Sequence, residues 1–362
     1  MSDFIYSNIT IAYTGSDPNG LSAVRGFVQS NTPILQRPSD YYCTITRFSL
    51  DTTTSPLIIP LIQLGQTDPN LTQYVVSLSY NGVYASNNVI YVPSDITQPI
   101  PNPPNVSLDV SSRYYYIYSY QGFLSMINTA LATTLADLNA LTATGETVPP
   151  EFYYDPNYGI VLKCPQTYGQ SYNTTPDNNL IQISVGSNLS VLFGYGFPYV
   201  TLIGNTSPAI HTIVLYGNGS SNVEINNVPY WVLPIQSPAE LSAWCESVTY
   251  QIISTLPIQY EFSSVPDSAY GVPNTGGASQ QSILTDFQVD STNPVAYHAQ
   301  LVYNQSNTLR MINMTSNDPL YRYDIVSVLF TDRYGRQFPL LLGANQNVSL
   351  KFSFVRRTVY SK

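Results

Sequence analysis

The chain has 362 residues, enough for one large β domain or two ordinary ones. Only 10% of the residues are charged, whereas tyrosine (31 residues) and proline (27 residues) are abundant, so surface polarity must come from hydroxyls and amides. This composition is typical of a β-rich protein with many turns whose surfaces are covered by neighbours, because interfaces favour Tyr and disfavour Lys and Glu. The alternative is a β protein with neutral loops, such as a lectin, and composition does not exclude it.

The net charge of −9 is unevenly distributed along the chain. From residue 301 onward there are eight basic and three acidic residues, which gives +5 there and leaves −9 − 5 = −14 for residues 1–300. This asymmetry favours one basic end that faces nucleic acid or an acidic partner. The alternative is a solvated strand edge guarded by arginine, and the sequence does not choose between the two.

Cysteine usage and the N-terminus predict a compartment. Cys43, Cys164 and Cys245 lie far apart without metal-ligand spacing, which argues against structural zinc and against a disulfide framework. We expect buried thiols in a reducing compartment. The first residues lack the cationic and apolar segments of a secretory signal, and no stretch is apolar enough for a membrane helix. We therefore expect synthesis in the cytoplasm and no membrane-spanning segment.

In the first half of the chain, short strands and turns lead to one clear helix. Asn81-Gly82 lies between two apolar–polar segments, which is the strongest short-range signal for a hairpin. In residues 114–120 a tyrosine recurs at every second position, which predicts a strand with a tyrosine-coated face, either half-buried or an interface. Residues 122–141 have Leu and Ile at helical spacing.

In the second half, residues 211–225 repeat the hairpin pattern around Gly217-Asn218-Gly219. A second helix is predicted for 237–253, with Ser237 as its N-cap and Ile252 on its apolar face.

Two further stretches are rich in turn residues. Residues 263–281 carry Pro and Gly and few large apolar side chains, which indicates a long surface loop or the edge of an inserted subdomain. In 328–342, two apolar runs flank the charged turn Asp332 to Gly335, which predicts a hairpin.

Signatures of catalysis are absent from the sequence. The two histidines form no metal-ligand pattern, and there is no P-loop, Rossmann glycine motif or nucleophile elbow. Carboxylate pairs of glycoside hydrolases come from distant strands, so a few acids stay candidates. These are Glu151, Asp155, Glu246 and Glu261, of which Asp155 is in a turn sequence. No nucleic-acid-binding module is present either. We expect no enzymatic activity, no cofactor and no metal.

The order of several segments resembles a known family. YYCTITRFSL precedes SPLIIPLI and the hairpin near Asn81, and these are followed by YYYIYSYQGFLSMINTAL, PEFYYDPNYGIVL, LSVLFGYGF, SILTDFQVD and LYRYDIVSVLFTDRYGRQFPLLL ahead of VSLKFSFVRR. From about residue 40 to 357, this order is similar to that of the minor capsid (penton) proteins of virophages and Polinton-like viruses. Residues 200–280 are the least similar part.

The resemblance implies an all-β fold: a single jelly-roll β-sandwich over residues 1–362, with short helices and an inserted β-rich subdomain at 200–280. It implies a structural virion protein that forms homopentamers at the fivefold vertices of an icosahedral double-stranded DNA virus capsid, beside a double jelly-roll major capsid protein. The basic C-terminal segment would contact the genome or an acidic partner without sequence specificity. The interface residues expected on this hypothesis are Asp332, Arg333, Arg336, Arg356 and Arg357.

A second hypothesis of a different class is a carbohydrate- or receptor-binding β-sandwich. In that case the tyrosine-rich faces would stack on sugars. Saturable glycan binding by a monomer or trimer would favour it, whereas pentamers would favour the capsid vertex.

Overall fold

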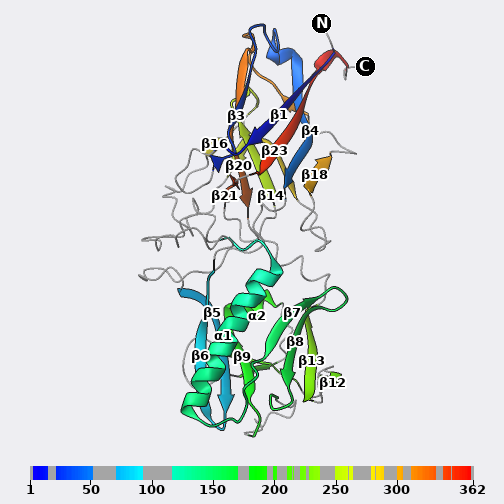
Figure 1. The fold of residues 1–362 in the computed structure, drawn as a ribbon. Helices are drawn as coiled ribbons and strands as arrows, with labels where there is room; N and C mark the ends of the chain where they lie inside the picture. Colours follow the sequence, from blue (N-terminus) through cyan, green and yellow to red (C-terminus); the bar gives the residue numbers. More distant parts are fainter. Residues whose placement is uncertain are drawn as a thin grey trace.

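The computed structural model shows two lobes that follow each other along one long axis, with both chain termini at the free end of the upper lobe (Figure 1). The structure describes residues 3–14, 22–51, 71–92, 116–169, 179–193, 199–201, 210–213, 215, 221–225, 228–236, 249–259, 261–263, 279–281, 283–288, 300–304, 311–331, 337–343 and 345–359.

The upper lobe is built from strands at the two ends of the sequence. They are β1 (Phe4–Ala12), β2 (Ser22–Ala23), β3 (Gly26–Gln29), β4 (Tyr41–Asp51), β14 (Thr249–Ser254), β15 (Glu261–Ser263), β16 (Ser279–Gln281), β17 (Ile283–Gln288), β18 (Gln300–Asn304), β19 (Ile312–Asn313), β20 (Arg322–Thr331), β21 (Gln337–Pro339), β22 (Leu341–Leu342) and β23 (Asn347–Arg356). Two short 3-10 helices, η1 (Pro38–Asp40) and η6 (Arg357–Val359), complete it.

The strand order of the upper lobe is that of a jelly roll. One sheet has the order β1-β23-β4-β18, and the other has β17-β14-β20 with β3 on the far side of β20. When the eight main strands are numbered along the chain, one sheet contains the first, eighth, third and sixth, and the other contains the fifth, fourth, seventh and second. This arrangement of two facing sheets is the eight-stranded jelly roll, and it confirms the expected fold class.

Alternating side chains explain why the two sheets face each other. On β1, Ile9 and Ile11 are buried, while Tyr6 on the other face is 58% exposed. Tyr323 of the facing sheet packs edge-on against Phe352 and Phe354, with ring centroids 5.7 and 6.2 Å apart. Each fully buried large apolar side chain of this kind contributes about 1.5–3 kcal/mol.

The lower lobe, which we call the insert, is formed by described elements between residues 71 and 236, which follow β4 and precede β14. Its elements are β5 (Leu71–Tyr80), β6 (Val83–Ile90), α1 (Tyr120–Leu141), β7 (Glu151–Asp155), β8 (Gly159–Pro165), β9 (Gln182–Gly186), α2 (Ser187–Leu192), β10 (Tyr199–Thr201), β11 (Ile210–Thr212), β12 (Ser221–Ile225) and β13 (Val228–Gln236). They form the sheets β10-β11-β9-β5-β6 and β12-β13-β8-β7, and α1 packs against β5, β6 and β7.

The helix predicted for 122–141 is confirmed as α1. Its N-cap is Ser119, whose hydroxyl accepts a hydrogen bond from the backbone N–H of Gly122 at 3.1 Å. Leu131 and its helical neighbours are buried in the insert. Asn128 joins the helix to β7, because its amide both donates to and accepts from the backbone of Phe152 at 2.8 Å.

The buried apolar residues fall into two separate clusters, one in each lobe. Strands from 200–280 contribute to both, because β13 supplies Leu233 to the insert cluster and β14 supplies Tyr250 to the jelly-roll cluster. The subdomain expected at 200–280 therefore does not coincide with the insert, whose cluster begins at Tyr74. The resemblance to the family is weakest at residues 200–280, which include the segment where the two lobes join. The resemblance did not predict which residues form the apolar cluster of the insert.

Two hairpins are confirmed and one is wrong. Asn81 and Gly82 have φ of 49° and 78° and join β5 to β6, and β20 pairs with β21 on either side of 332–336. The described strands of the hairpin expected at 211–225 do not pair with each other, since β11 pairs with β9 and β10, whereas β12 pairs with β13 of the other sheet. The turn expected at Gly217-Asn218-Gly219 lies outside the described residues.

Two other expectations need correction. In the tyrosine segment, the described residues from Tyr116 on form no strand; Tyr116 is buried in the jelly-roll cluster, whereas Tyr120 begins α1 in the insert. The helix expected at 237–253 cannot include Ile252, which lies in β14 between Thr285 and Val328. Residues 237–248 lie outside the described part of the chain.

Candidate assembly surfaces

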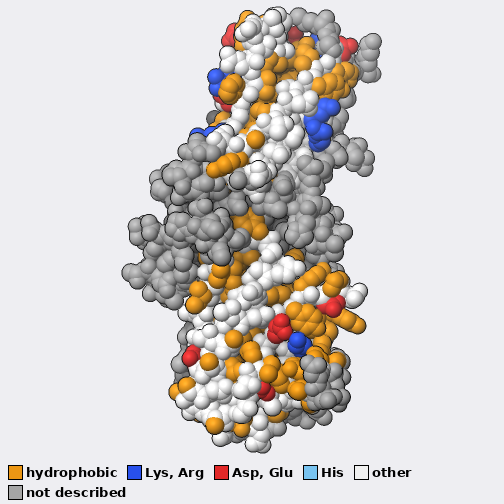
Figure 2. Space-filling view, in the orientation of Figure 1, with side chains coloured by type: hydrophobic (Ala, Val, Ile, Leu, Met, Phe, Trp, Pro, Cys, Tyr) orange, Lys and Arg blue, Asp and Glu red, His pale blue; other side chains and the backbone are white. Residues whose placement is uncertain are grey.

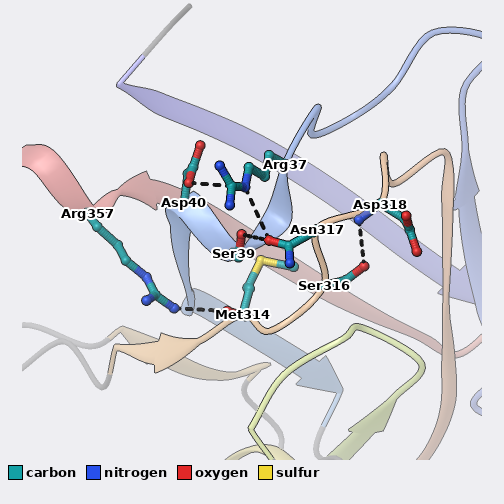
Figure 3. A network of polar contacts seen from close by, with 8 residues as sticks. All are labelled: Arg37, Ser39, Asp40, Met314, Ser316, Asn317, Asp318 and Arg357. Carbon is teal, nitrogen blue, oxygen red and sulfur yellow. Dashed lines mark hydrogen bonds and ion pairs between the residues drawn. The ribbon is translucent and has the colours of Figure 1, made fainter.

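The end of the jelly roll farthest from the insert carries a polar network, which we call the terminal end (Figure 3). It combines residues 37–40, residues 314–318 and the C-terminal Arg356 and Arg357. The side-chain oxygen of Asn317 accepts hydrogen bonds from Arg37 Nε at 3.2 Å and from Ser39 Oγ at 2.7 Å. The backbone N–H of Ser39 donates to the carbonyl of Ser316 at 2.7 Å. These bonds tie together two loops that are nearly 280 positions apart.

Arg357 holds the last part of the chain against this end of the sandwich. Its Nη2 donates to the carbonyl of Met314 at 2.9 Å, and its guanidinium lies 5.3 Å from the ring centroid of Tyr42. Its buried Nε has no hydrogen-bond partner among the described residues. The planar guanidinium therefore works mainly as a clamp on the chain's own backbone and an aromatic ring.

The terminal end is less basic than the sequence suggests. Arg37 and Asp40 form an exposed ion pair with 3.8 Å between Nε and Oδ1. The backbone N–H of Arg356 donates to the carbonyl of Asp3 at 3.0 Å, which brings a further carboxylate-bearing residue close. Farther along β20, Arg322 pairs with Asp324 at 2.8 Å. Acidic residues thus lie close to these arginines, and the expected contact with the genome stays a prediction.

The structure describes two of the five expected interface residues. Arg356 and Arg357 lie at the terminal end, because β23 ends there. Asp332, Arg333 and Arg336 lie outside the described residues. Their flanking strands β20 and β21 end on the side of the jelly roll that faces the insert (Figure 1).

A second surface, the β1/β3 edge, was missed from the sequence. Phe4, Tyr6 and Phe27 are 42%, 58% and 58% exposed on β1 and β3, two strands that contact each other. The cation of Lys351 lies 5.0 Å from the ring centroid of Tyr6, and Arg322 lies 4.5 Å from that of Phe27. Outward aromatic residues opposite buried isoleucines in β1 were the signal for this surface.

The outer face of the insert sheet β12-β13-β8-β7 is a third surface, which we call the insert sheet face. At its centre, Lys163 Nζ lies 3.1 Å from Glu151 Oε2. The same Nζ lies 6.0 and 5.8 Å from the ring centroids of Tyr153 and Tyr230. Partial burial, with a smaller contribution from the carboxylate of Asp155, raises the pKa of the Tyr153 phenol and keeps it neutral.

The carboxylates considered for glycoside hydrolysis have structural roles where their side chains are described. Glu151 pairs with Lys163, and Asp155 Oδ1 accepts from the backbone N–H groups of Asn157 and Tyr158 at 2.7 and 3.1 Å. Glu246 and the side chain of Glu261 lie outside the described part.

The described residues contain no cluster of three or more potential metal-ligating side chains. Cys43 and Cys164 are free and buried, as expected, and Cys245 lies outside the described part. Among the described helices, none is both long and apolar enough to cross a membrane.

Comparison with known proteins identifies the family. The family model for Sputnik minor capsid protein V18/19 matches residues 5–356. The chain belongs to the Sputnik minor capsid protein V18/19 family. A Sputnik virophage relative, "Uncharacterized protein V18", is 39% identical over 145 residues, which is 38% of this chain and 86% of the relative. The V18/19 assignment confirms the resemblance seen in the sequence and makes the protein a structural component of a virophage capsid.

Solved structures support the V18/19 assignment. A chain in the 3.5 Å cryo-EM structure of the Sputnik virophage matches with a TM-score of 0.76 and 30% identity, covering 100% of both chains. The mavirus penton protein has the same fold, with a TM-score of 0.56 and 18% identity over 97% of this chain and 99% of that one.

Proposed function

We propose that this protein forms the homopentameric vertex, or penton, of an icosahedral double-stranded DNA virus capsid. Membership of a minor capsid protein family, combined with a jelly-roll lobe, is the observation that carries the proposal. Its fold likeness to the mavirus penton protein points the same way. The jelly roll is an open sandwich in which β1 and β18 are the outer strands of one sheet. A closed ring covers such edges, because each copy presents two different sides to its two neighbours.

The β1/β3 edge is the best-equipped surface for the ring contact. Aromatic and arginine side chains dominate the binding energy of protein interfaces. Here Tyr6 and Phe27 are exposed, and each already has a cation beside its ring. Burying these pairs against the β18 side of a neighbour removes apolar ring surface from water, and Asp324 remains the ion-pair partner of Arg322.

Within this proposal, each of the other expected partners is assigned to its own surface. The terminal end, with Arg356 and Arg357, is assigned to a capsid neighbour or to the packaged genome. Asp332, Arg333 and Arg336 are assigned to a subunit contact. The double jelly-roll major capsid protein is the neighbour around the ring, and synthesis takes place in the host cytoplasm.

Native mass spectrometry of the purified chain, alone and with the major capsid protein, tests the proposal. Pentamers in either condition are expected. The double variant Tyr6→Glu/Phe27→Glu should weaken them by at least about tenfold, because loss of one interface hot spot costs about 2 kcal/mol or more. Leu141→Glu, at an exposed position on the insert, is the matched control. Monomers or trimers of the unmodified chain in both conditions would contradict the proposal.

A further inference from the structure

The insert sheet face exposes several large apolar side chains to solvent. Val223 and Ile225 on the outer strand β12 are 39% and 36% exposed, and Val228 on β13 is 43% exposed. Val223 is opposite Tyr230 and Ile225 is opposite Val228, so all four side chains share one face. Figure 2 shows hydrophobic side chains gathered over β7, β8 and β13 on the right of the lower lobe, with few charged atoms among them.

The only described cation on this face is already neutralised within the chain. Lys163 is 30% exposed, pairs with Glu151 and lies between the rings of Tyr153 and Tyr230. Because the charge has its partners, the face offers no unpaired cation to an acidic polymer. A surface with central tyrosines, an aliphatic rim and no unpaired cation among the described residues is typical of a protein contact.

The position of this face indicates which protein covers it. The insert is joined to the jelly roll through β4 and β14, so every copy in a ring carries its insert at the same height. In Figure 1, β12 and β13 lie on the same side of the long axis as β18, opposite β3 and β6. The neighbour that covers the β18 side of the jelly roll therefore also meets the β12 side of the insert.

The opposite side of the insert supplies a surface to receive it. On β6, Tyr84 and Ile90 are 48% and 56% exposed, on the face that points away from the insert cluster. In the part of the chain that the structure describes, β6 has only β5 as a neighbouring strand. Two outer strands with exposed apolar side chains thus lie on opposite sides of one lobe, as a head-to-tail ring requires.

We propose that the insert sheet face is a second subunit contact, which packs against the β6 side of the insert in a neighbouring copy of this chain. The inference rests on the proposed pentamer and adds a contact between inserts to the one between jelly rolls. Its residues are Val223, Ile225, Val228, Tyr230 and Tyr153 on one copy and Tyr84 and Ile90 on the next.

Charge substitutions test this contact directly. The variant Val223→Glu/Ile225→Glu is expected to shift the concentration midpoint of ring dissociation upward by about tenfold or more, because carboxylates become buried in an apolar contact. Leu141→Glu, at a position that is 64% exposed on the insert, should leave the midpoint unchanged. Adding Tyr84→Lys and Ile90→Lys to the double variant should restore assembly, because each lysine then faces a glutamate of the next copy.

The outcomes separate this inference from the proposed function. Pentamers of the double variant with an unchanged midpoint would overturn the insert contact and leave the vertex assignment intact. If the unmodified chain forms no pentamers with or without the major capsid protein, both fall. Binding of a glycan or of the major capsid protein at this face, with ring stability unaffected, would also overturn it.

A second measurement covers variants that do not fold. Backbone hydrogen exchange of β12 and β13 in the unmodified protein should slow on ring formation. Equal exchange in ring and monomer would count against the contact.

Discussion

The separation of the two apolar clusters can be tested by weakening one of them. Leu131 in α1 has no exposed surface and belongs to the insert cluster. Leu131→Ala leaves a cavity there and should destabilise the insert by about 2–5 kcal/mol. Because no residue belongs to both clusters, the stability of the jelly roll should remain unchanged.

Hydrogen exchange followed by mass spectrometry resolves the two lobes. For amides that exchange by opening of the whole insert, such as those of β5 and β9, the rate should rise on the order of 30-fold to several thousand-fold, since 1.4 kcal/mol is a factor of ten. Amides of β4 and β23 should keep their rates. Leu350→Ala, at an equally buried position in β23, should give the reverse pattern. Equal acceleration in both lobes for either variant would refute the independence of the clusters.

Three further predictions concern single side chains. Asn128→Ala removes both hydrogen bonds to the Phe152 backbone and should cost the insert about 1–3 kcal/mol in urea unfolding, because buried backbone groups lose partners. Arg357→Met should lower jelly-roll stability by about 1–2 kcal/mol in thermal unfolding, whereas an unchanged midpoint would show that the contacts of Arg357 do not contribute to stability. Burial raises the pKa of Cys43 and of Tyr323 to about 12, above their usual 9.0 and 10.0, so the folded state holds these protons more tightly. Stability should be fully present below about pH 9 and fall as pH rises toward 12, and a flat profile would contradict this.

Local signals in the sequence predicted elements whose cause is local. The N-cap and the Leu spacing of α1 lie within one segment, and Asn81 and Gly82 adopt the positive φ that a two-residue hairpin turn favours. At 211–225 the same reasoning failed, because β11 forms its bonds with β9 and β12 forms its bonds with β13. Contacts between distant segments in the two sheets determine which strands pair. The turn sequence alone does not contain this information.

Periodicity alone also misassigned Ile252. Its spacing from earlier apolar residues fits a helix, but β14 lies between β17 and β20 and has side chains buried in the jelly-roll core. In a central strand with one buried face, apolar residues can occur at spacings that also fit a short helix. The family resemblance identified the jelly roll, whereas it placed the insertion too late in the chain.

Of the candidate interface, the sequence identified charge but missed the aromatic surfaces. Charged residues are rare in this chain, which favours them as interface candidates. Arg357, however, donates a hydrogen bond to the backbone carbonyl of Met314 in the same chain. Tyr6 and Phe27 stood out less among the many aromatic residues, and their exposure depends on the sheet face they occupy.

The boundary between the lobes has a mechanical consequence. Tyr116 packs against Phe330 in the jelly-roll cluster, and its neighbour Ile117 is buried in the insert cluster. A described segment just before α1 therefore contacts both cores, in addition to the links between β4 and β5 and between β13 and β14. A lobe that is linked to its neighbour by two chain segments only can rotate about them. The contact of Tyr116 with the jelly-roll core restricts that rotation, so a force on the insert is also transmitted to the sandwich at the residues just before α1.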